Sequence, residues 1–272
     1  MFTLNDNDFY RLVNFVKNNY GIDLTKKRQL IVGRLSNTIS ALGMQSFTQY
    51  IDRIIAGENP DDIDTMLNHL TTNYTFFMRE ESHFTFFKNT ILPYLEQTKK
   101  NRVLSIWSAG CSSGQEPYTI SMILKEYFGT KANLWDTRVL ATDISQNALL
   151  SAQKAVYDIE SLKKLPPAWI KKYFVPTKEN GVYTISPILR NNVIFRTFNL
   201  MDPIQFRLKF DVIFCRNVMI YFDQQTKNAL VHRFYNATNS GGYLLIGHSE
   251  SLDRSELPYQ YIQPAIYRKK AL

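Results

Sequence analysis

The 272-residue sequence predicts an α/β domain preceded by an all-α N-terminal domain. Two observations predict this division. Apolar residues before about residue 90 recur at helical spacing, whereas after about residue 102 short apolar runs alternate with loops and helical stretches. That alternation is typical of a largely parallel sheet with helices on both faces. The hydrophobic fraction of 44% is large enough to bury a core and argues against disorder.

Residues 1–72 are expected to form the helical domain. Asp6 or Asn7 is expected to cap the first helix, and Gly21 to end it, because glycine tolerates the left-handed backbone that often follows a helix. A second helix is expected over residues 25–42. Asn59-Pro60-Asp61-Asp62 predicts a later helix start, since it combines a cap, a proline at the first helical position and carboxylates in the first turn.

Residues 91–272 are expected to form the α/β domain, with a strand at each short apolar run. The expected strands are residues 103–107, 138–143, 193–198, 210–215 and 243–247, with a terminal pair near 259–262 and 266–268. Helices are expected over residues 117–124, 145–155 and 223–239, the last closed by Gly241-Gly242. Residues 165–192 break the alternation with prolines and an Asn180-Gly181 pair. They predict a small inserted antiparallel β-subdomain with a hairpin at residues 179–181.

The formal net charge of +8 is unevenly distributed along the chain. Residues 1–72 contain seven basic and eight acidic residues, so the excess lies in the second part. Residues 160–200 alone contain seven basic residues and only two acidic ones. A basic region of this kind suits a nucleic acid or an acidic protein surface, although it is equally compatible with a solvated face.

Composition also limits the compartment and the metal chemistry. No stretch approaches the roughly 20 apolar residues of a membrane-spanning helix, and the first residues lack the pattern of a secretory signal. These features predict a cytoplasmic protein without membrane insertion. Two cysteines cannot form a disulfide framework, and His69 and His83 lack partners at metal-ligand spacing. We therefore predict no metal site.

The first glycine-containing loop of the α/β domain is the expected ligand site, because ligands of open α/β sheets lie beyond the carboxyl ends of the strands. Gly110 and Gly114 allow close approach of the backbone, but their spacing is not that of a dinucleotide or triphosphate loop. Asp143 closes the next strand, where a carboxylate can accept both hydroxyls of a ribose, although a tight turn and a helix-capping aspartate would explain the same residues. Glu116 lies in the following helix and would suit a cationic amine. A nucleoside with an amine and no phosphate indicates S-adenosylmethionine.

Longer motifs make this interpretation specific. The segments 72–80 (TNYTFFMRE), 108–118 (SAGCSSGQEPY), 199–200 (NL), 214–222 (FCRNVMIYF) and 247–251 (GHSES) occur in this order. Together they resemble the CheR family of bacterial chemotaxis receptor methyltransferases, and the resemblance covers essentially the whole chain. It implies a Rossmann-like S-adenosylmethionine-dependent methyltransferase domain. It further implies an enzyme that methylates glutamate side chains of chemotaxis receptors, giving glutamyl methyl esters for sensory adaptation.

The resemblance also implies roles for individual residues. Residues 73–90 would form a linker helix that carries part of the site. Arg79 and Tyr221 would lie nearest the transferred methyl group and serve as catalytic residues. The residues implied to hold S-adenosylmethionine, or its product S-adenosylhomocysteine, are Asn73, Thr75, Arg79, Glu116, Asp143, Asn199, Leu200, Arg216 and Asn217.

The implied partner is the cytoplasmic helix bundle of a receptor, bound by a monomeric enzyme. Relatives dock this bundle through an arginine-rich second helix, whereas residues 33–43 here contain Arg34 as their only charge. Docking is therefore expected to be weaker there, or to shift to Lys26, Lys27 and Arg28, and residues 160–200 should matter more. Some relatives also bind a C-terminal receptor peptide through the inserted β-subdomain, but the loop 175–181 is short in this chain.

Two other functions stay open. An RNA or DNA methyltransferase would suit the positive charge, although Cys215-Arg216-Asn217 replaces the Asp/Asn-Pro-Pro-aromatic sequence of many base-amino methyltransferases. A non-catalytic module that senses the cofactor is the other alternative.

Individual residues have structural alternatives as well. Tyr74, Phe76 and Phe77 suit a core better than a site, and Arg79 could pair with Glu80 or Glu81. Tyr221 could be ordinary packing. Cys215 suits an inert buried thiol, and the His248–Glu250 pair suits a loop rather than a catalytic dyad.

Overall fold

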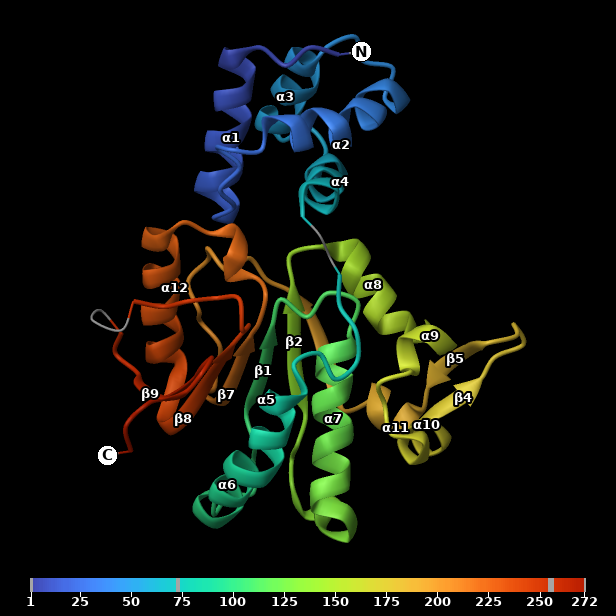
Figure 1. Cartoon of the computed structure of the whole chain (residues 1–272), viewed down its shortest axis with the longest axis vertical. Coiled ribbons are helices and arrows are strands. Elements are labelled where there is room, and N and C mark those ends of the chain that lie inside the picture. The colour runs from blue at the N-terminus through green and yellow to red at the C-terminus, as the bar shows by residue number, and fades with distance from the viewer. Residues whose placement is uncertain (1, 72–73, 254–256, 272) are drawn as a thin grey trace.

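A computed structural model describes residues 2–71, 74–253 and 257–271. Its N-terminal part is a domain of helices at one end of the molecule (Figure 1). These helices are α1 (Asp6–Tyr20), α2 (Arg28–Ala41), α3 (Phe47–Ala56) and α4 (Pro60–Leu70). Asn5 caps α1 by accepting the Asp8 N–H at 2.8 Å, and Gly21 follows it with φ of 73°.

Three sequence expectations for this domain need correction. The cap of α1 is Asn5 rather than Asp6 or Asn7, and α2 begins at Arg28 rather than Thr25, because residues 25–26 form a turn. The helix α3 was not predicted, although Ser46 caps it by accepting the Gln49 N–H. The predicted start at Asn59 is confirmed, since its side chain accepts the Asp61 N–H.

The second part is built on a seven-stranded sheet with the order β6-β2-β1-β7-β8-β10-β9. The first five of these strands run parallel, and the last two pair antiparallel. The strands are β1 (Ile106–Ala109), β2 (Val139–Asp143), β6 (Val193–Thr197), β7 (Phe210–Cys215), β8 (Thr238–Ile246), β9 (Gln260–Gln263) and β10 (Ile266–Arg268). The predicted α/β class, with its terminal strand pair, is confirmed.

Helices pack on both faces of the sheet, because its strands are apolar on both sides. Ile106 and Val212 face a core with α5 (Glu81–Phe86), the π-helical η1 (Phe87–Ile91), α6 (Leu92–Thr98) and α7 (Gln115–Phe128). The next residues along, Trp107 and Ile213, face a core with α12 (Gln224–Ala237). The helix α8 (Gln146–Lys154) packs beside β2 and β6. The helical run from α5 to α6 continues across residue 90, which was the expected boundary between the linker helix and the methyltransferase domain.

An inserted unit follows α8, as predicted, but it begins earlier. Its antiparallel sheet has the order β3-β5-β4, and β3 starts at Val156 rather than after residue 165. The unit consists of β3 (Val156–Asp158), α9 (Ile159–Leu162), α10 (Pro167–Tyr173), β4 (Phe174–Pro176), β5 (Val182–Ile185) and α11 (Pro187–Arg190). The hairpin is confirmed, with Gly181 at φ of 74°, and it projects from the side of the molecule in Figure 1.

The expectation that Gly241 and Gly242 close the last helix is wrong. The helix α12 already ends at Ala237, and both glycines lie inside β8, where the register against β7 shifts. Gly241 has φ of 77°, and a Cβ there would lie 2.1 Å from the hydroxyl of Tyr94. Glycine is therefore needed for a bulge against a packed tyrosine rather than for a helix end.

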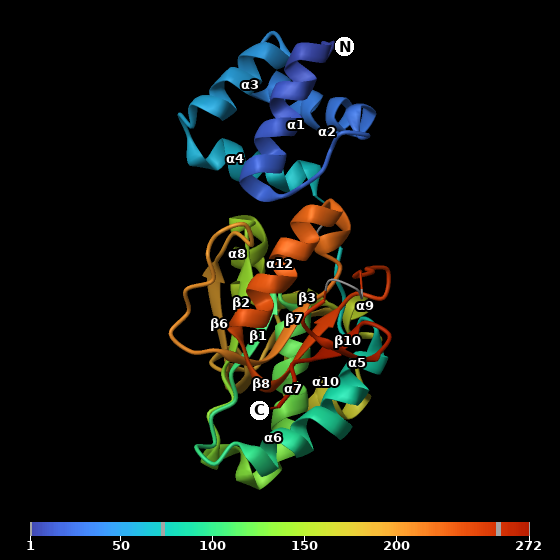
Figure 2. The same cartoon turned by 90° about the vertical axis from the view of Figure 1, so that its left-hand side faces the viewer.

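The helical domain lies over the carboxyl edge of the sheet, as both views show (Figures 1 and 2). An isolated bridge pairs Ile22 with Phe222, and the Asp23 N–H donates to the Tyr221 carbonyl at 2.7 Å. Within the described part of the chain, we find no helix with the length and apolar character needed to cross a bilayer.

Candidate functional site

A pocket lies between the two domains at the carboxyl edge of the sheet. Its walls come from the loops after β1, β2, β6 and β7, from the connector before α5, and from the helical domain. The lining residues include Tyr20, Ile22, Thr71, Tyr74, Thr75, Arg79, Gly110, Cys111, Ser112, Glu116, Asp143, Ile144, Phe198, Asn199, Leu200, Arg216, Asn217, Val218, Tyr221 and Phe222. This is where an open α/β sheet places its ligand.

The loop after β1 is held against its neighbours by backbone contacts. The amides of Gly110 and Cys111 donate to the carbonyl of Thr142 at 2.8 and 2.9 Å. Gly110 has φ of 88°, and a Cβ at this position would lie 2.3 Å from Val218. Glycine is therefore required both for the turn and for the close packing of the loops after β1 and β7. Cys111 is buried, and burial raises the pKa of its thiol.

Asp143 ends β2 and is 9% exposed. One carboxylate oxygen accepts the Ser112 N–H at 2.7 Å, and the other accepts the Ser145 N–H at 2.9 Å. Burial raises the pKa of Asp143, although these amides oppose the shift. The Ile144 amide also favours the ionised carboxylate, but a carboxylate can accept about four hydrogen bonds, so Asp143 keeps acceptor capacity on the pocket wall for a ribose hydroxyl. The geometry therefore fits recognition of a ribose.

Arg216 lies between two carboxylates at the floor of the pocket. Its side chain is 2% exposed, and it donates to Glu116 at 3.0 Å and to Glu80 at 3.1 Å. The other Glu116 oxygen accepts the Ser108 hydroxyl at 2.6 Å. Burial raises the pKa of Glu116, and Arg216 opposes this shift. When Glu80 and Glu116 are both ionised, the single guanidinium leaves one negative charge uncompensated, which fits a cationic amine.

Arg79 stands at the rim of the pocket and has no ion pair with Glu80 or Glu81 among the described residues. Its guanidinium donates to the Tyr74 carbonyl at 2.8 Å and lies 5.9 Å from the centre of the Phe76 ring. The aromatic residues beside it divide in role. Phe77 is fully buried, as expected of a core residue, whereas Tyr74 is 70% exposed and lines the pocket.

The loop after β7 carries Asn217 and Tyr221. Asn217 has φ of 60°, an uncommon backbone conformation for a residue other than glycine. The carboxylate of Glu250, from the loop after β8, accepts the Asn217 N–H at 3.0 Å. Glu250 does not form a dyad with His248, since its hydrogen bonds go to backbone amides. Cys215 is buried at the strand end, and burial raises the pKa of its thiol, as expected of an unreactive cysteine.

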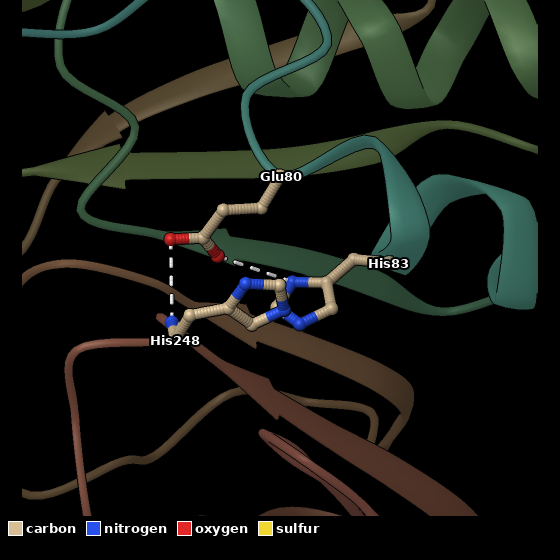
Figure 3. Close-up of side chains that lie close together, drawn as sticks. All are labelled: Glu80, His83 and His248. Carbon is tan, nitrogen blue, oxygen red and sulfur yellow. Dashed lines mark hydrogen bonds and ion pairs between the residues drawn. The ribbon is translucent and has the colours of Figure 1, made fainter.

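Behind this loop, Glu80, His83 and His248 come together (Figure 3). One potential ligand atom from each lies within 4.8 Å of the others, so the expectation that His83 lacks such neighbours is wrong. Burial lowers the pKa of His83 to about 3, which keeps the ring neutral. The Glu80 oxygen nearest His83 already accepts from Arg216, and the other accepts the His248 N–H at 3.2 Å. A cation here would face the buried guanidinium of Arg216, so we interpret the cluster as a structural link between the start of α5 and the loop after β8.

The pocket brings together nearly all the residues that the sequence resemblance selects. Arg79 and Tyr221 line it, as do Thr75, Glu116, Asp143, Asn199, Leu200, Arg216 and Asn217, while Asn73 lies outside the described residues. The Asn199 amide binds the Asn19 carbonyl at 2.7 Å and the Met201 N–H at 3.0 Å, so it also ties the loop to the helical domain.

Sequence reasoning missed the contribution of the helical domain. Tyr20, Ile22 and Thr71 line the pocket from that side. Gly21 was identified only as a helix end, yet a Cβ there would lie 2.7 Å from Met201 of the sheet domain. Tyr20 and Ile22 flank the helix-ending Gly21, and this was the available signal in the sequence. The sequence pattern does not indicate what these two side chains pack against.

Comparisons with known proteins agree with this geometry. The CheR methyltransferase all-alpha domain matches residues 7–71, and the CheR methyltransferase SAM binding domain matches residues 73–267. A chemotaxis protein methyltransferase of Borreliella burgdorferi is 40% identical over 98% of this chain and 97% of its own length. Chemotaxis protein methyltransferase Cher2 of Pseudomonas putida is 34% identical over 94% of each chain. The Escherichia coli chemotaxis protein methyltransferase is 33% identical over 97% of this chain and 91% of its own.

The pocket, the buried carboxylate of Asp143 and both domain matches have one consistent explanation. The cofactor is S-adenosylmethionine, and the chain is a methyltransferase enzyme. It belongs to the CheR methyltransferase family.

Proposed function

We propose that this enzyme methylates glutamate side chains on the cytoplasmic helix bundle of chemotaxis receptors and thereby serves sensory adaptation. The relatives' names support the receptor as the substrate. The observation that carries the chemistry is the site itself, in which Arg79 and Tyr221 lie at the rim of the pocket that holds Asp143 and Glu116.

The cofactor residues divide by chemistry. When bound, S-adenosylmethionine supplies an electrophilic methyl group on a sulfonium. The ribose hydroxyls would bind Asp143, and the amine of the methionine part would bind Glu116, which Arg216 and Ser108 orient. Buried Leu200, with Ile144 beside it in the pocket wall, gives an apolar surface for the adenine. The remaining residues that we propose to hold the cofactor are Asn73, Thr75, Arg79, Asn199 and Asn217.

The acceptor needs little activation. A glutamate carboxylate has a reference pKa of about 4.3 and is therefore already an anion at neutral pH, so the enzyme requires no general base. What this chain must supply is alignment and exclusion of water. Arg79 stands where a positive charge can guide the incoming carboxylate, and Tyr221 lines the same pocket from the loop after β7.

Docking of the receptor bundle is proposed to use the inserted unit more than α2. In the helical domain, Arg34 donates to the carbonyls of His69 and Thr71, and Arg28 binds Asp6. Both are thus engaged within the domain. In the inserted unit, exposed Lys164 lies 4.2 Å from the centre of the Phe76 ring, directly beside the pocket rim. We further propose that the enzyme acts as a monomer in the cytoplasm.

The decisive experiment offers a panel of receptor cytoplasmic fragments to the enzyme with methyl-labelled S-adenosylmethionine. Fragments with and without their C-terminal tails test whether the inserted unit binds a terminal peptide. Label that alkali releases as methanol supports the ester. Alkali-stable label on RNA or DNA would instead support the nucleic-acid alternative, and cofactor binding without any transfer would support a sensing module. Arg79→Ala and Tyr221→Phe should each slow transfer more than they weaken cofactor binding.

A further inference from the structure

We infer that Glu250 is a positioning residue for methyl transfer: its buried carboxylate sets the backbone of the loop 216–221, and thereby places Tyr221 and Asn217 in the pocket. This inference rests on the proposed function, because it assigns Tyr221 to the reacting centre. Glu250 itself does not line the pocket, so it acts through the loop and not on the substrate.

The contacts of Glu250 are concentrated on backbone amides. The residue is 7% exposed, and its Oε2 accepts the N–H groups of Asn217, at 3.0 Å, and of Gly247. The amides of Met219 and Ile220 also favour the ionised carboxylate, although burial raises the pKa of Glu250 overall. A single buried side chain thus satisfies amides of two loops, one after β7 and one after β8.

The loop has features that make such an anchor necessary. Asn217 has φ of 60°, a left-handed conformation that asparagine tolerates better than most residues and that turns the chain sharply at the start of the loop. The two loops are in tight contact, because a Cβ on Gly247 would lie 2.6 Å from Nδ2 and 2.8 Å from the backbone nitrogen of Asn217. Between Asn217 and Tyr221 the chain makes only the short 3-10 helix η3 (Met219–Tyr221). Any change of backbone angle at Asn217 therefore moves Tyr221.

The opposite end of the loop has one backbone contact with the helical domain. The Tyr221 carbonyl accepts the Asp23 N–H from the helical domain at 2.7 Å. Neighbouring His248 is occupied elsewhere, since its Nε2 lies 3.4 Å from the Ser82 hydroxyl and its ring packs edge-to-face on His83. The carboxylate of Glu250 consequently holds the end of the loop that leaves the sheet, and it influences the site through the loop backbone.

The test is a double-mutant cycle between Glu250→Gln and Tyr221→Phe. Glutamine keeps the size of the side chain but removes the negative charge that the amides of Asn217, Gly247, Met219 and Ile220 favour, and it leaves only one oxygen that can accept from them. We expect Glu250→Gln to lower kcat about tenfold with a smaller change in the KM for the receptor fragment. In the Tyr221→Phe background the same substitution should cost less than threefold. Equal losses in both backgrounds would show that Glu250 does not act through Tyr221.

Asp211→Asn is the matched control. Asp211 is also a buried carboxylate, 2% exposed, which accepts the Ser105 N–H at 3.0 Å and pairs with Lys99 at 2.8 Å. It lies near the start of β7, at the other end of the strand from the pocket. Its replacement should lower the unfolding temperature and leave the kcat of the folded enzyme unchanged. If Asp211→Asn and Glu250→Gln lower kcat alike, the positioning role is refuted.

The failure of the proposed function would be visible separately. If the wild-type enzyme transfers no methyl group to any receptor fragment, the receptor assignment is wrong, and the cycle is then run on affinity for S-adenosylhomocysteine. Glu250→Gln should weaken that affinity in the wild-type background and have less than half of this effect, in free energy, beside Asn217→Ala. Undiminished loss beside Asn217→Ala would refute the inference without reference to catalysis.

Discussion

The pocket and the inserted unit place their charges in opposite ways. In the pocket, Arg216 is 6% exposed and lies between Glu80 and Glu116. In the inserted unit, the Lys163 and Glu160 side chains pair while 64% and 67% exposed. Exposed pairs contribute little and are screened by salt, whereas buried ones fix geometry because breaking them leaves an uncompensated charge. The charged residues of the pocket thus hold a fixed geometry, whereas those of the inserted unit contribute a salt-screened electrostatic potential at the surface.

This difference predicts that substitutions in the two regions fail in different ways. Changes in the pocket should alter stability or cofactor affinity at any ionic strength. Changes in the inserted unit should leave both intact and alter only the encounter with an acidic partner, most strongly at low salt.

The largest effect is expected for Arg216→Met, which keeps most of the side-chain volume but removes the charge. The side chains of Glu80 and Glu116, which are 15% and 14% exposed, are then left without their cation. The free energy of unfolding should therefore fall by about 3–5 kcal/mol. Urea denaturation measures this. As a control, Arg138→Met removes an exposed partner of Asp136 and should cost less than about 1 kcal/mol. Equal losses in the two variants would contradict the comparison.

Asp143→Ala should weaken the binding of S-adenosylhomocysteine about 100-fold in titration calorimetry. The substitution removes hydrogen bonds to a charged acceptor, each worth about 1.5–3 kcal/mol. Asp136→Ala, at the amino end of the same strand, should leave the affinity unchanged. Retained affinity in Asp143→Ala would mean that the ribose is recognised elsewhere in the pocket.

Glu116 should make cofactor affinity depend on pH. Burial raises its pKa above the ordinary value near 4.5, so the free enzyme takes up this proton at higher pH than an exposed glutamate does. The protonated acid no longer attracts an ammonium. Affinity should therefore fall as the pH is lowered from neutrality, beginning at a higher pH than for an exposed glutamate, by at most about tenfold per pH unit once below the pKa. In Glu116→Gln the affinity should be lower at pH 7 and less dependent on pH.

The sign of the stability effect provides a check on this titration. A carboxyl whose pKa is raised by folding binds more protons in the folded than in the unfolded state, so its contribution to stability increases as the pH falls. Affinity and unfolding free energy should therefore change in opposite directions at Glu116. Asp143 titrates in the same sense, and Asp143→Asn separates its share.

The smallest effect is expected for the inserted unit. Lys164→Glu combined with Lys171→Glu should lower kcat/KM for a receptor fragment about three- to tenfold at low ionic strength, and the loss should vanish near 1 M salt. Lys172 and Arg190 are poorer choices, because Lys172 binds Glu126 and Arg190 binds the Gln153 carbonyl. Lys26→Glu combined with Lys27→Glu is the control on the helical domain. A larger loss from that pair would reverse the proposed docking surface.

The sequence allowed the main elements of the fold to be predicted where local signals were complete. The strand over residues 210–215 has the predicted bounds, and Asn59 starts a helix as its capping chemistry requires. Prediction failed where tertiary packing decided the outcome. Gly241 follows a helical pattern, yet the packed Tyr94 and the register of β8 place it in a strand. The strand β3 has only three residues, too few for a periodic signal.

The site shows the same division. Its candidate residues could be named from motifs because each strand end is a local feature of the sequence. The residues that hold them could not. Glu80, Glu250 and Ile22 act through contacts between segments that are distant in sequence. Asn217 bonds to Glu250, which is 33 positions away, and to Glu80, which is 137 positions away.

The backbone bridge between Ile22 and Phe222 has a thermodynamic consequence. Because one wall of the pocket belongs to the helical domain, a ligand that touches both walls also cross-links the two domains. By thermodynamic reciprocity, any partner that stabilises the contact between the domains raises the affinity for the ligand, and the ligand raises the affinity for that partner by the same factor. A receptor that grips the helical domain would in this way alter affinity for the methyl donor without touching it.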